Sequence, residues 1–84
     1  MHKDKSENER NNICGCKIKE YRLSLPQKTS QRQFADMLQI EGLDVDKNVI
    51  QRIESGVRFV TDIELKAIAK LLKVSCDELL DINT

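Results

Sequence analysis

Proline, glycine and aromatic residues are scarce in this chain. Its 84 residues include one proline, three glycines, two phenylalanines, one tyrosine and no tryptophan. Sandwiches and barrels need many turn residues, and their strands are rich in aromatic and β-branched side chains. The scarcity of these residues argues against an all-β fold. A composition of 33% charged and 39% hydrophobic residues is typical of a small, helix-rich globular domain.

Long apolar runs are also absent. No stretch of about 18 consecutive apolar residues occurs, so the sequence predicts no transmembrane helix. The start of the chain, MHKDKSENERNN, has no apolar segment of the kind found in secretory signals. We therefore expect a cytoplasmic protein that has no membrane partner. The length suits one small domain with a thin core.

Cysteine and histidine are few, and they are not spaced as a metal site or a catalytic centre requires. The three cysteines are Cys14, Cys16 and Cys76, and the one histidine is His2. A structural zinc site needs four ligands at recognisable spacing, and an odd number of cysteines argues against a disulfide framework. No serine or cysteine lies near a base at a catalytic spacing, and no phosphate-binding loop is present. We expect no metal, no cofactor and no enzymatic activity.

The formal net charge is zero, which argues mildly against nucleic-acid binding. The charges are nevertheless unevenly distributed. Residues 13–28 include four basic residues and one acidic residue, whereas residues 61–84 include three basic and five acidic residues. One side of the domain can therefore be positive, and for docking the local field matters more than the net charge.

Hydrophobic spacing and capping residues predict an all-α fold of five helices. Residues 1–12 are polar with mixed charges and read as a flexible arm, followed by one domain over residues 13–84. The first helix is expected over residues 13–25 and the second over about residues 31–41. Capping boxes mark the starts of the second, fourth and fifth helices, at Ser30 with Gln33, Thr61 with Glu64, and Ser75 with Glu78.

The third predicted helix covers residues 46–55. Asp46 can cap its start, and Gly56 can adopt the left-handed conformation that closes a helix, as Gly42 can for the second helix. Ile53 is expected to face the core. In the extended segment that follows, Phe59 is expected to fill the space under the loop.

The outer face of this third helix carries hydrogen-bond donors and amides instead of the usual mixture of charges. The side chains are Lys47, Asn48, Gln51 and Arg52. Asn and Gln can pair with adenine, and Arg and Lys can pair with guanine, in the major groove of DNA. A merely solvated helix usually combines Glu and Lys four residues apart, but no acidic residue lies between Lys47 and Ile53. The helix is therefore a candidate for reading base edges.

Residues 17–80 resemble the Cro and phage-repressor-like helix-turn-helix family, also called the Xre family. The matching stretches are KIKEYR, SQRQFADML, IQRIESGVR and DIELKAIAKLLKVSCDELL. The resemblance implies a compact five-helix lambda-repressor-like bundle, in which the second and third helices form the DNA-binding unit. It also implies base contacts by Lys47, Asn48 and Arg52 with Gln51 beside them, phosphate contacts by Gln31 and Arg58, and an ion pair between Arg22 and Glu54. From the residues alone, Arg22 and Glu54 could equally be two separate surface charges.

The function that we predict is sequence-specific binding of double-stranded DNA by a small, repressor-like transcriptional regulator. One helix reads too few base pairs for a genome, so a homodimer on a palindromic site is expected. The dimer surface is predicted on the last helix, from Leu79, Leu80 and Ile82, which could instead belong to the core. The alternative function is a protein-interaction module or an antitoxin with the same fold, which the neutral charge and the acidic C-terminal segment would suit.

Overall fold

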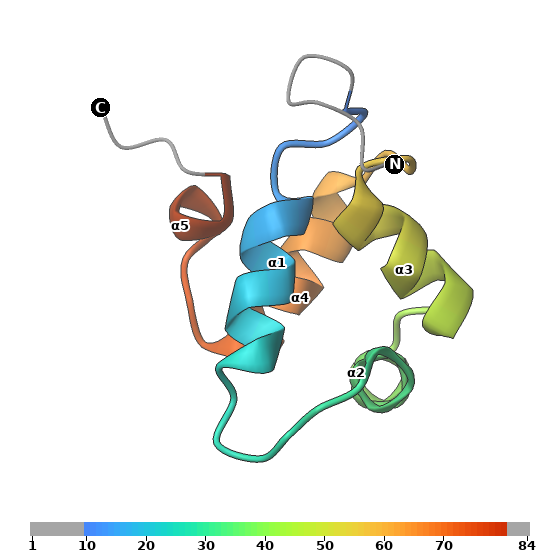
Figure 1. The fold of residues 1–84 in the computed structure, drawn as a ribbon, viewed down its shortest axis with the longest axis vertical. Helices are drawn as coiled ribbons and strands as arrows, with labels where there is room; N and C mark the ends of the chain where they lie inside the picture. Colours follow the sequence, from blue (N-terminus) through green and yellow to red (C-terminus); the bar gives the residue numbers. More distant parts are fainter. Residues whose placement is uncertain (1–9, 81–84) are drawn as a thin grey trace, which may run out of the picture.

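The computed structural model describes residues 10–80, which form five α-helices and no strand (Figure 1). The all-α, five-helix prediction is therefore confirmed for this part of the chain. The helices are α1 (Gly15–Leu23), α2 (Gln31–Ile40), α3 (Lys47–Ser55), α4 (Asp62–Leu72) and α5 (Cys76–Leu80). The first helix is shorter than predicted, because it begins at Gly15 and ends at Leu23. Ile82 lies outside the described residues.

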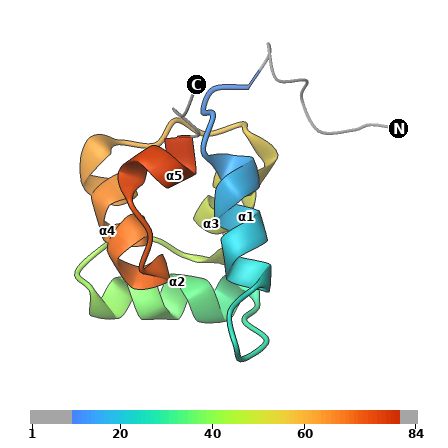
Figure 2. The same ribbon diagram turned by 90° about the vertical axis from the view of Figure 1, so that its left-hand side faces the viewer.

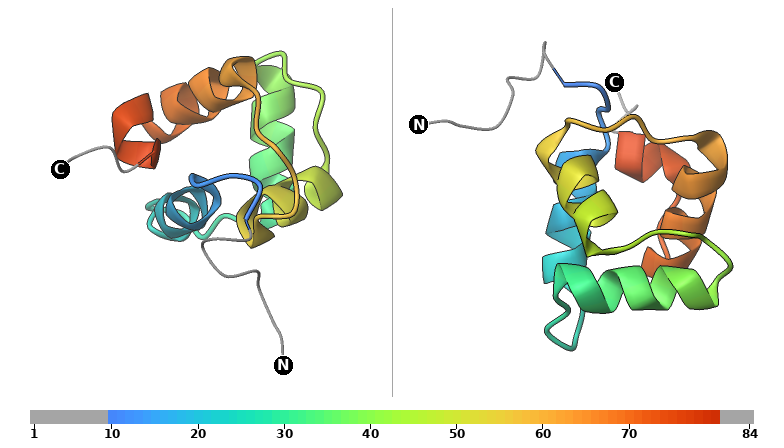
Figure 3. Two further views of the ribbon diagram at one scale, coloured as in Figure 1. Left: turned by 90° about the horizontal axis from the view of Figure 1, so that it is seen from above. Right: turned by 90° about the vertical axis from the view of Figure 1, so that its right-hand side faces the viewer.

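The five helices surround one core, and α3 and α5 lie on opposite sides of it (Figures 1 and 3). In Figure 2, α2 runs across the lower ends of α1 and α4. The side chains that are 1% exposed or less come from all five helices: Ile18, Phe34, Ala35, Leu38, Ile50, Ile53, Ile68 and Leu79. Each helix thus gives its apolar face to the same interior, which holds α3 in a fixed place.

The starts of the helices follow local sequence rules. In all three predicted capping boxes, a Ser or Thr hydroxyl accepts the backbone N–H three residues later, and the Glu or Gln side chain accepts a backbone N–H in return. Asp46 caps α3 by accepting the N–H of Val49 at 2.9 Å. Gly42 and Gly56 have φ angles of 95° and 87°, so both adopt the predicted left-handed conformation.

The connection between α2 and α3, residues 41–46, is packed against the core. Val45 is 3% exposed, and Gln39 Nε2 donates to its carbonyl oxygen at 2.6 Å. Leu43 N–H donates to Leu38 O at 3.0 Å, which closes the end of α2. These contacts fix the direction in which the chain enters α3.

Two predictions about apolar side chains are wrong. Phe59 is 71% exposed and does not fill the space under the loop. Successive side chains of an extended segment point to opposite sides, and it is the neighbouring Val60 that packs against the core. Leu79 is completely buried and Leu80 is partly buried against the core. Leu79 therefore belongs to the core and cannot supply a dimer surface.

Within residues 10–80, no helix is long and apolar enough to cross a membrane.

Candidate nucleic-acid interface

Helix α3 lies on the side of the molecule that faces the viewer in the right-hand view of Figure 3. Ile50 and Ile53 are each 1% exposed and anchor the helix. The four predicted base-reading side chains, Lys47, Asn48, Gln51 and Arg52, are all exposed. Among the described residues, none of these four side chains forms a hydrogen bond or an ion pair. Their donors are therefore free to meet a ligand.

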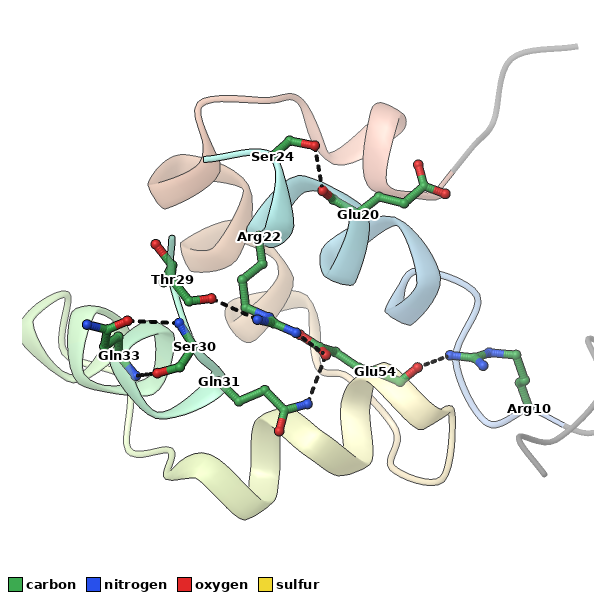
Figure 4. Close-up of polar contacts among 9 residues, drawn as sticks. All are labelled: Arg10, Glu20, Arg22, Ser24, Thr29, Ser30, Gln31, Gln33 and Glu54. Atoms are coloured by element: carbon green, nitrogen blue, oxygen red, sulfur yellow. Dashed lines mark hydrogen bonds and ion pairs between the residues drawn. The ribbon is translucent and has the colours of Figure 1, made fainter. Parts of the chain in front are cut away.

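Glu54, on the inner side of α3, is the centre of a polar network (Figure 4). Arg22 on α1 donates from Nε to Glu54 Oε2 at 2.7 Å and from Nη2 to Glu54 Oε1 at 3.0 Å. The side chains of Arg22 and Glu54 are only 7% and 3% exposed. Arg22 Nη1 also donates to the carbonyl oxygen of Thr29, at 2.8 Å. The structure thus brings Arg22 and Glu54 together as a buried, bidentate pair that joins α1 to α3.

Gln31, predicted to contact a phosphate, lies in the first turn of α2 and is bonded to the same network. Its Nε2 donates to Glu54 Oε1 at 3.0 Å (Figure 4). As at the start of any α-helix, the N–H groups of Gln31 and Arg32 have no acceptor within the helix, and the cap of Ser30 satisfies the N–H of Gln33. Such a helix start favours an anion, because the free N–H groups and the helix dipole are both positive there.

Arg58, the other predicted phosphate contact, is paired with Glu64 on α4. Its Nη1 and Nη2 donate to Oε1 and Oε2 of Glu64, each at 2.9 Å. The hydrogen bonds from Arg58 lower the pKa of Glu64 below its ordinary value, and the same carboxylate raises the pKa of Arg58. The sequence reasoning did not find this partner. A phosphate at this position has to share the guanidinium with Glu64.

We expect this pair to make stability depend on pH. Because the pKa of Glu64 is lower in the folded state, its contribution is present above the ordinary value of 4.5 and is lost as the pH falls through the lowered value. The Glu64→Gln variant keeps a capping-box acceptor for Thr61 but has no charge to titrate. In urea unfolding, the wild type is expected to be the more stable protein at pH 7, and the difference should shrink below pH 4.5. If the unfolding free energies of the wild type and of Glu64→Gln changed in parallel with pH, the pairing of Glu64 with Arg58 would be contradicted.

Arg32 is a basic residue at this surface that the sequence reasoning missed. Its exposed side chain lines the same surface hollow as Lys47 and Asn48. Two carboxylates, of Asp36 and Asp46, line this hollow as well. The position of Arg32, one residue after Gln31 in the first turn of α2, is the feature of the sequence that could have revealed it.

No cysteine lines the surface hollow beside Arg32, Lys47 and Asn48. Burial raises the pKa of the Cys14 thiol, which is 3% exposed, whereas Cys16 is exposed. Within residues 10–80, no group of three or more His, Cys, Asp or Glu side chains is arranged to hold a metal ion.

Two packed helices joined by a fixed turn, the second of them with an exposed polar face, define a helix-turn-helix protein. A family model described as Helix-turn-helix matches residues 18–79. The chain therefore belongs to this Xre and lambda-repressor-like family, whose members are DNA-binding domains. No curated protein and no solved structure matches the chain.

Proposed function

We propose that this protein is a small, repressor-like transcriptional regulator that binds a specific sequence of double-stranded DNA and reads the major groove with α3. The single observation that carries the proposal is the set of four exposed side chains on α3 that have no partner among the described residues, although the helix itself is firmly anchored. Their chemistry matches the donor and acceptor patterns of base edges. A rigid helix with a free polar face is what major-groove reading requires.

In this proposal, base contacts and phosphate contacts come from different elements. Lys47, Asn48, Gln51 and Arg52 contact bases from α3. Gln31 and Arg58 contact phosphates on either side of α3, and Arg32 adds a third phosphate contact from the first turn of α2. Contacts to phosphates fix the position of the protein on the duplex, whereas contacts to base edges provide the specificity.

The proposal includes a homodimer on a palindromic site. Because Leu79 is buried, the dimer surface is assigned to the apolar side chains that follow α3, namely Val57, Phe59 and Ile63, which are 49%, 71% and 73% exposed. They occupy the loop after α3 and the first turn of α4. A contact there would keep the two copies of α3 near each other, as two half-sites on one face of DNA require.

The experiment that tests this function is a selection from a random pool of duplex DNA at moderate salt, with the bound fraction sequenced. An enriched palindrome supports a dimeric regulator, and the spacing of its half-sites gives the distance between the two copies of α3. Enrichment of a single half-site supports DNA reading but contradicts the dimer. No enrichment from a folded protein contradicts DNA reading and favours the interaction module or the antitoxin.

Arg52→Ala and Gln31→Ala are expected to differ in their effects on specificity. Losing a base contact should cost about 1–3 kcal/mol for the preferred site and relax preference at one base position. Losing a phosphate contact should weaken binding to all sequences alike. Titration of each variant with the selected site and with single-base variants of that site distinguishes the two. If both variants lost affinity for all sites equally, the assignment of Arg52 as a base reader would be contradicted. Thermal melting serves as the control that each variant is folded.

A further inference from the structure

Residues 10–12, which we call the N-terminal segment, are bonded to the end of α3. Carbonyl groups in the last turn of an α-helix lack donors within the helix. The N-terminal segment supplies donors from 41 to 46 positions away in the chain. The bonds run from Arg10 Nη2 to Glu54 O (2.9 Å), Asn11 N to Gly56 O (2.8 Å), Asn11 Nδ2 to Val57 O (2.7 Å), and Asn12 Nδ2 to Ile53 O (3.0 Å) and Arg58 O (2.7 Å).

These bonds change the domain boundary that the sequence predicted. The polar arm was expected to cover residues 1–12, but residues 10–12 are attached to the domain. Residues 1–9 lie outside the described part of the chain. Local periodicity could not reveal the attachment, because the bonds that attach the N-terminal segment to the end of α3 span 41 to 46 positions in the sequence.

Asn12 is the chemically most specific member of the N-terminal segment. Its Nδ2 donates to the two carbonyl groups of Ile53 and Arg58, while its Oδ1 accepts the N–H of Gly15 at 2.8 Å. One carboxamide therefore caps the start of α1 and the end of α3 together. Only a side chain with both donors and an acceptor in this arrangement can make all three bonds.

Arg10 fits closely against α3. Its guanidinium donates to Glu54 O and places a positive charge at the end of the helix, where the helix dipole is negative (Figure 4). Gly56 has a φ of 87°, and a Cβ atom added there would lie 2.6 Å from Arg10 Cζ. Glycine at this position thus serves both the turn and the close approach of Arg10.

We propose that Arg10 and Asn12 are positioning residues that hold the end of α3 in the orientation needed to read DNA. Helix α3 has only nine residues, and short helices are not stable in isolation. Arg52 lies in the last turn, and the N–H groups of Val57 and Arg58 both donate to its carbonyl oxygen. Loss of the N-terminal bonds therefore loosens both the last turn of α3, which carries Arg52, and the loop after it, which carries Arg58. The consequence for DNA rests on the function proposed above.

The test is Asn12→Asp, which keeps the shape of the side chain and the acceptor for Gly15 but replaces the donating amide by an oxygen. That oxygen faces the carbonyl groups of Ile53 and Arg58. Amide hydrogen exchange, followed by NMR well below the melting temperature, is expected to speed up about tenfold or more at Val57 and Arg58. Exchange at Ala69 in α4 should change much less. The variant should also discriminate less between the selected DNA site and a site that differs at the base read by Arg52.

A control variant and a second, milder variant make this test decisive. Lys66→Gln changes the net charge by the same amount at an exposed position on α4, and is expected to alter neither exchange nor discrimination. Arg10→Ala removes one bond to α3 and is expected to act in the same direction as Asn12→Asp, which covers the case in which Asn12→Asp does not fold.

Two outcomes would overturn the inference. Exchange that is unchanged at Val57 and Arg58, or accelerated equally at Ala69, would mean that the N-terminal segment does not position the end of α3. Unchanged base discrimination despite faster exchange at Val57 and Arg58 would mean that the position of the end of α3 does not matter for reading the DNA sequence. If the wild type enriches no duplex, the proposed function fails, while the exchange measurement still decides whether Arg10 and Asn12 hold α3.

Discussion

Replacing Ile53 with Asp is expected to unfold the domain. Ile53 is 1% exposed and faces the core from α3. The substitution removes a buried aliphatic side chain, whose burial contributes about 1.5–3 kcal/mol. It also buries a carboxylate that has no partner, which costs more than the loss of apolar contacts. Small domains are stable by only about 5–15 kcal/mol, so little of the folded population should survive.

Circular dichroism during heating and urea titration measures this effect. The matched control is Gln51→Asp, which places the same residue on the exposed face of the same helix. The control should melt cooperatively within a few degrees of the wild type, because exposed substitutions usually change stability by about 0.5 kcal/mol or less. An Ile53→Asp protein with the melting temperature of the wild type would show that Ile53 is not a core residue.

Breaking the pair of Arg22 and Glu54 is the second large effect that we expect. Glu54→Gln leaves the Arg22 guanidinium, in a side chain that is 7% exposed, without a counter-charge. Removing one partner of a buried ion pair typically costs about 3–5 kcal/mol. Arg22→Met should be similarly costly, because it leaves the Glu54 carboxylate buried and also removes the donor to Thr29 O.

Urea unfolding of the two single variants and of the double variant measures this coupling. The losses of unfolding free energy in the two single variants, added together, are expected to exceed the loss in the double variant by roughly 0.5–3 kcal/mol. The reason is that the double variant leaves no unpaired charge. Glu41→Gln is the control, since it removes the carboxylate from an exposed pair with Lys70 and should cost about 0–1 kcal/mol. If Glu54→Gln costs no more than Glu41→Gln, the buried pair does not stabilise the fold.

Much of the fold follows from interactions that are local in sequence. The capping boxes at Ser30, Thr61 and Ser75 each involve residues three positions apart, and the left-handed glycines close their own helices. Apolar spacing likewise predicted that Ile53 faces the core, because one face of a helix repeats every three or four residues. These features could be predicted because each depends on a short stretch of chain.

The features that the sequence did not reveal depend on contacts between distant segments. Gln31 meets Glu54, and Asn12 meets the end of α3, across 23 and 41 or more positions respectively. No periodicity relates such residues, so their partners appear only once the helices are packed. The partner of Arg58 was missed for another reason: the capping box accounted for Glu64, although a carboxylate can accept several hydrogen bonds at once. The burial of Leu79 depends on where α5 docks.

The separation of roles on α3 has a consequence for how this protein can evolve. The residues that anchor α3 point inward, whereas the four side chains of its outer face are exposed and form no hydrogen bond or ion pair within residues 10–80. Under the function proposed above, substitutions on that outer face are therefore expected to change the preferred DNA sequence with little penalty in stability. A lineage of such proteins can acquire new target sites while its scaffold stays the same, and new variants can be screened for specificity without first restoring the fold.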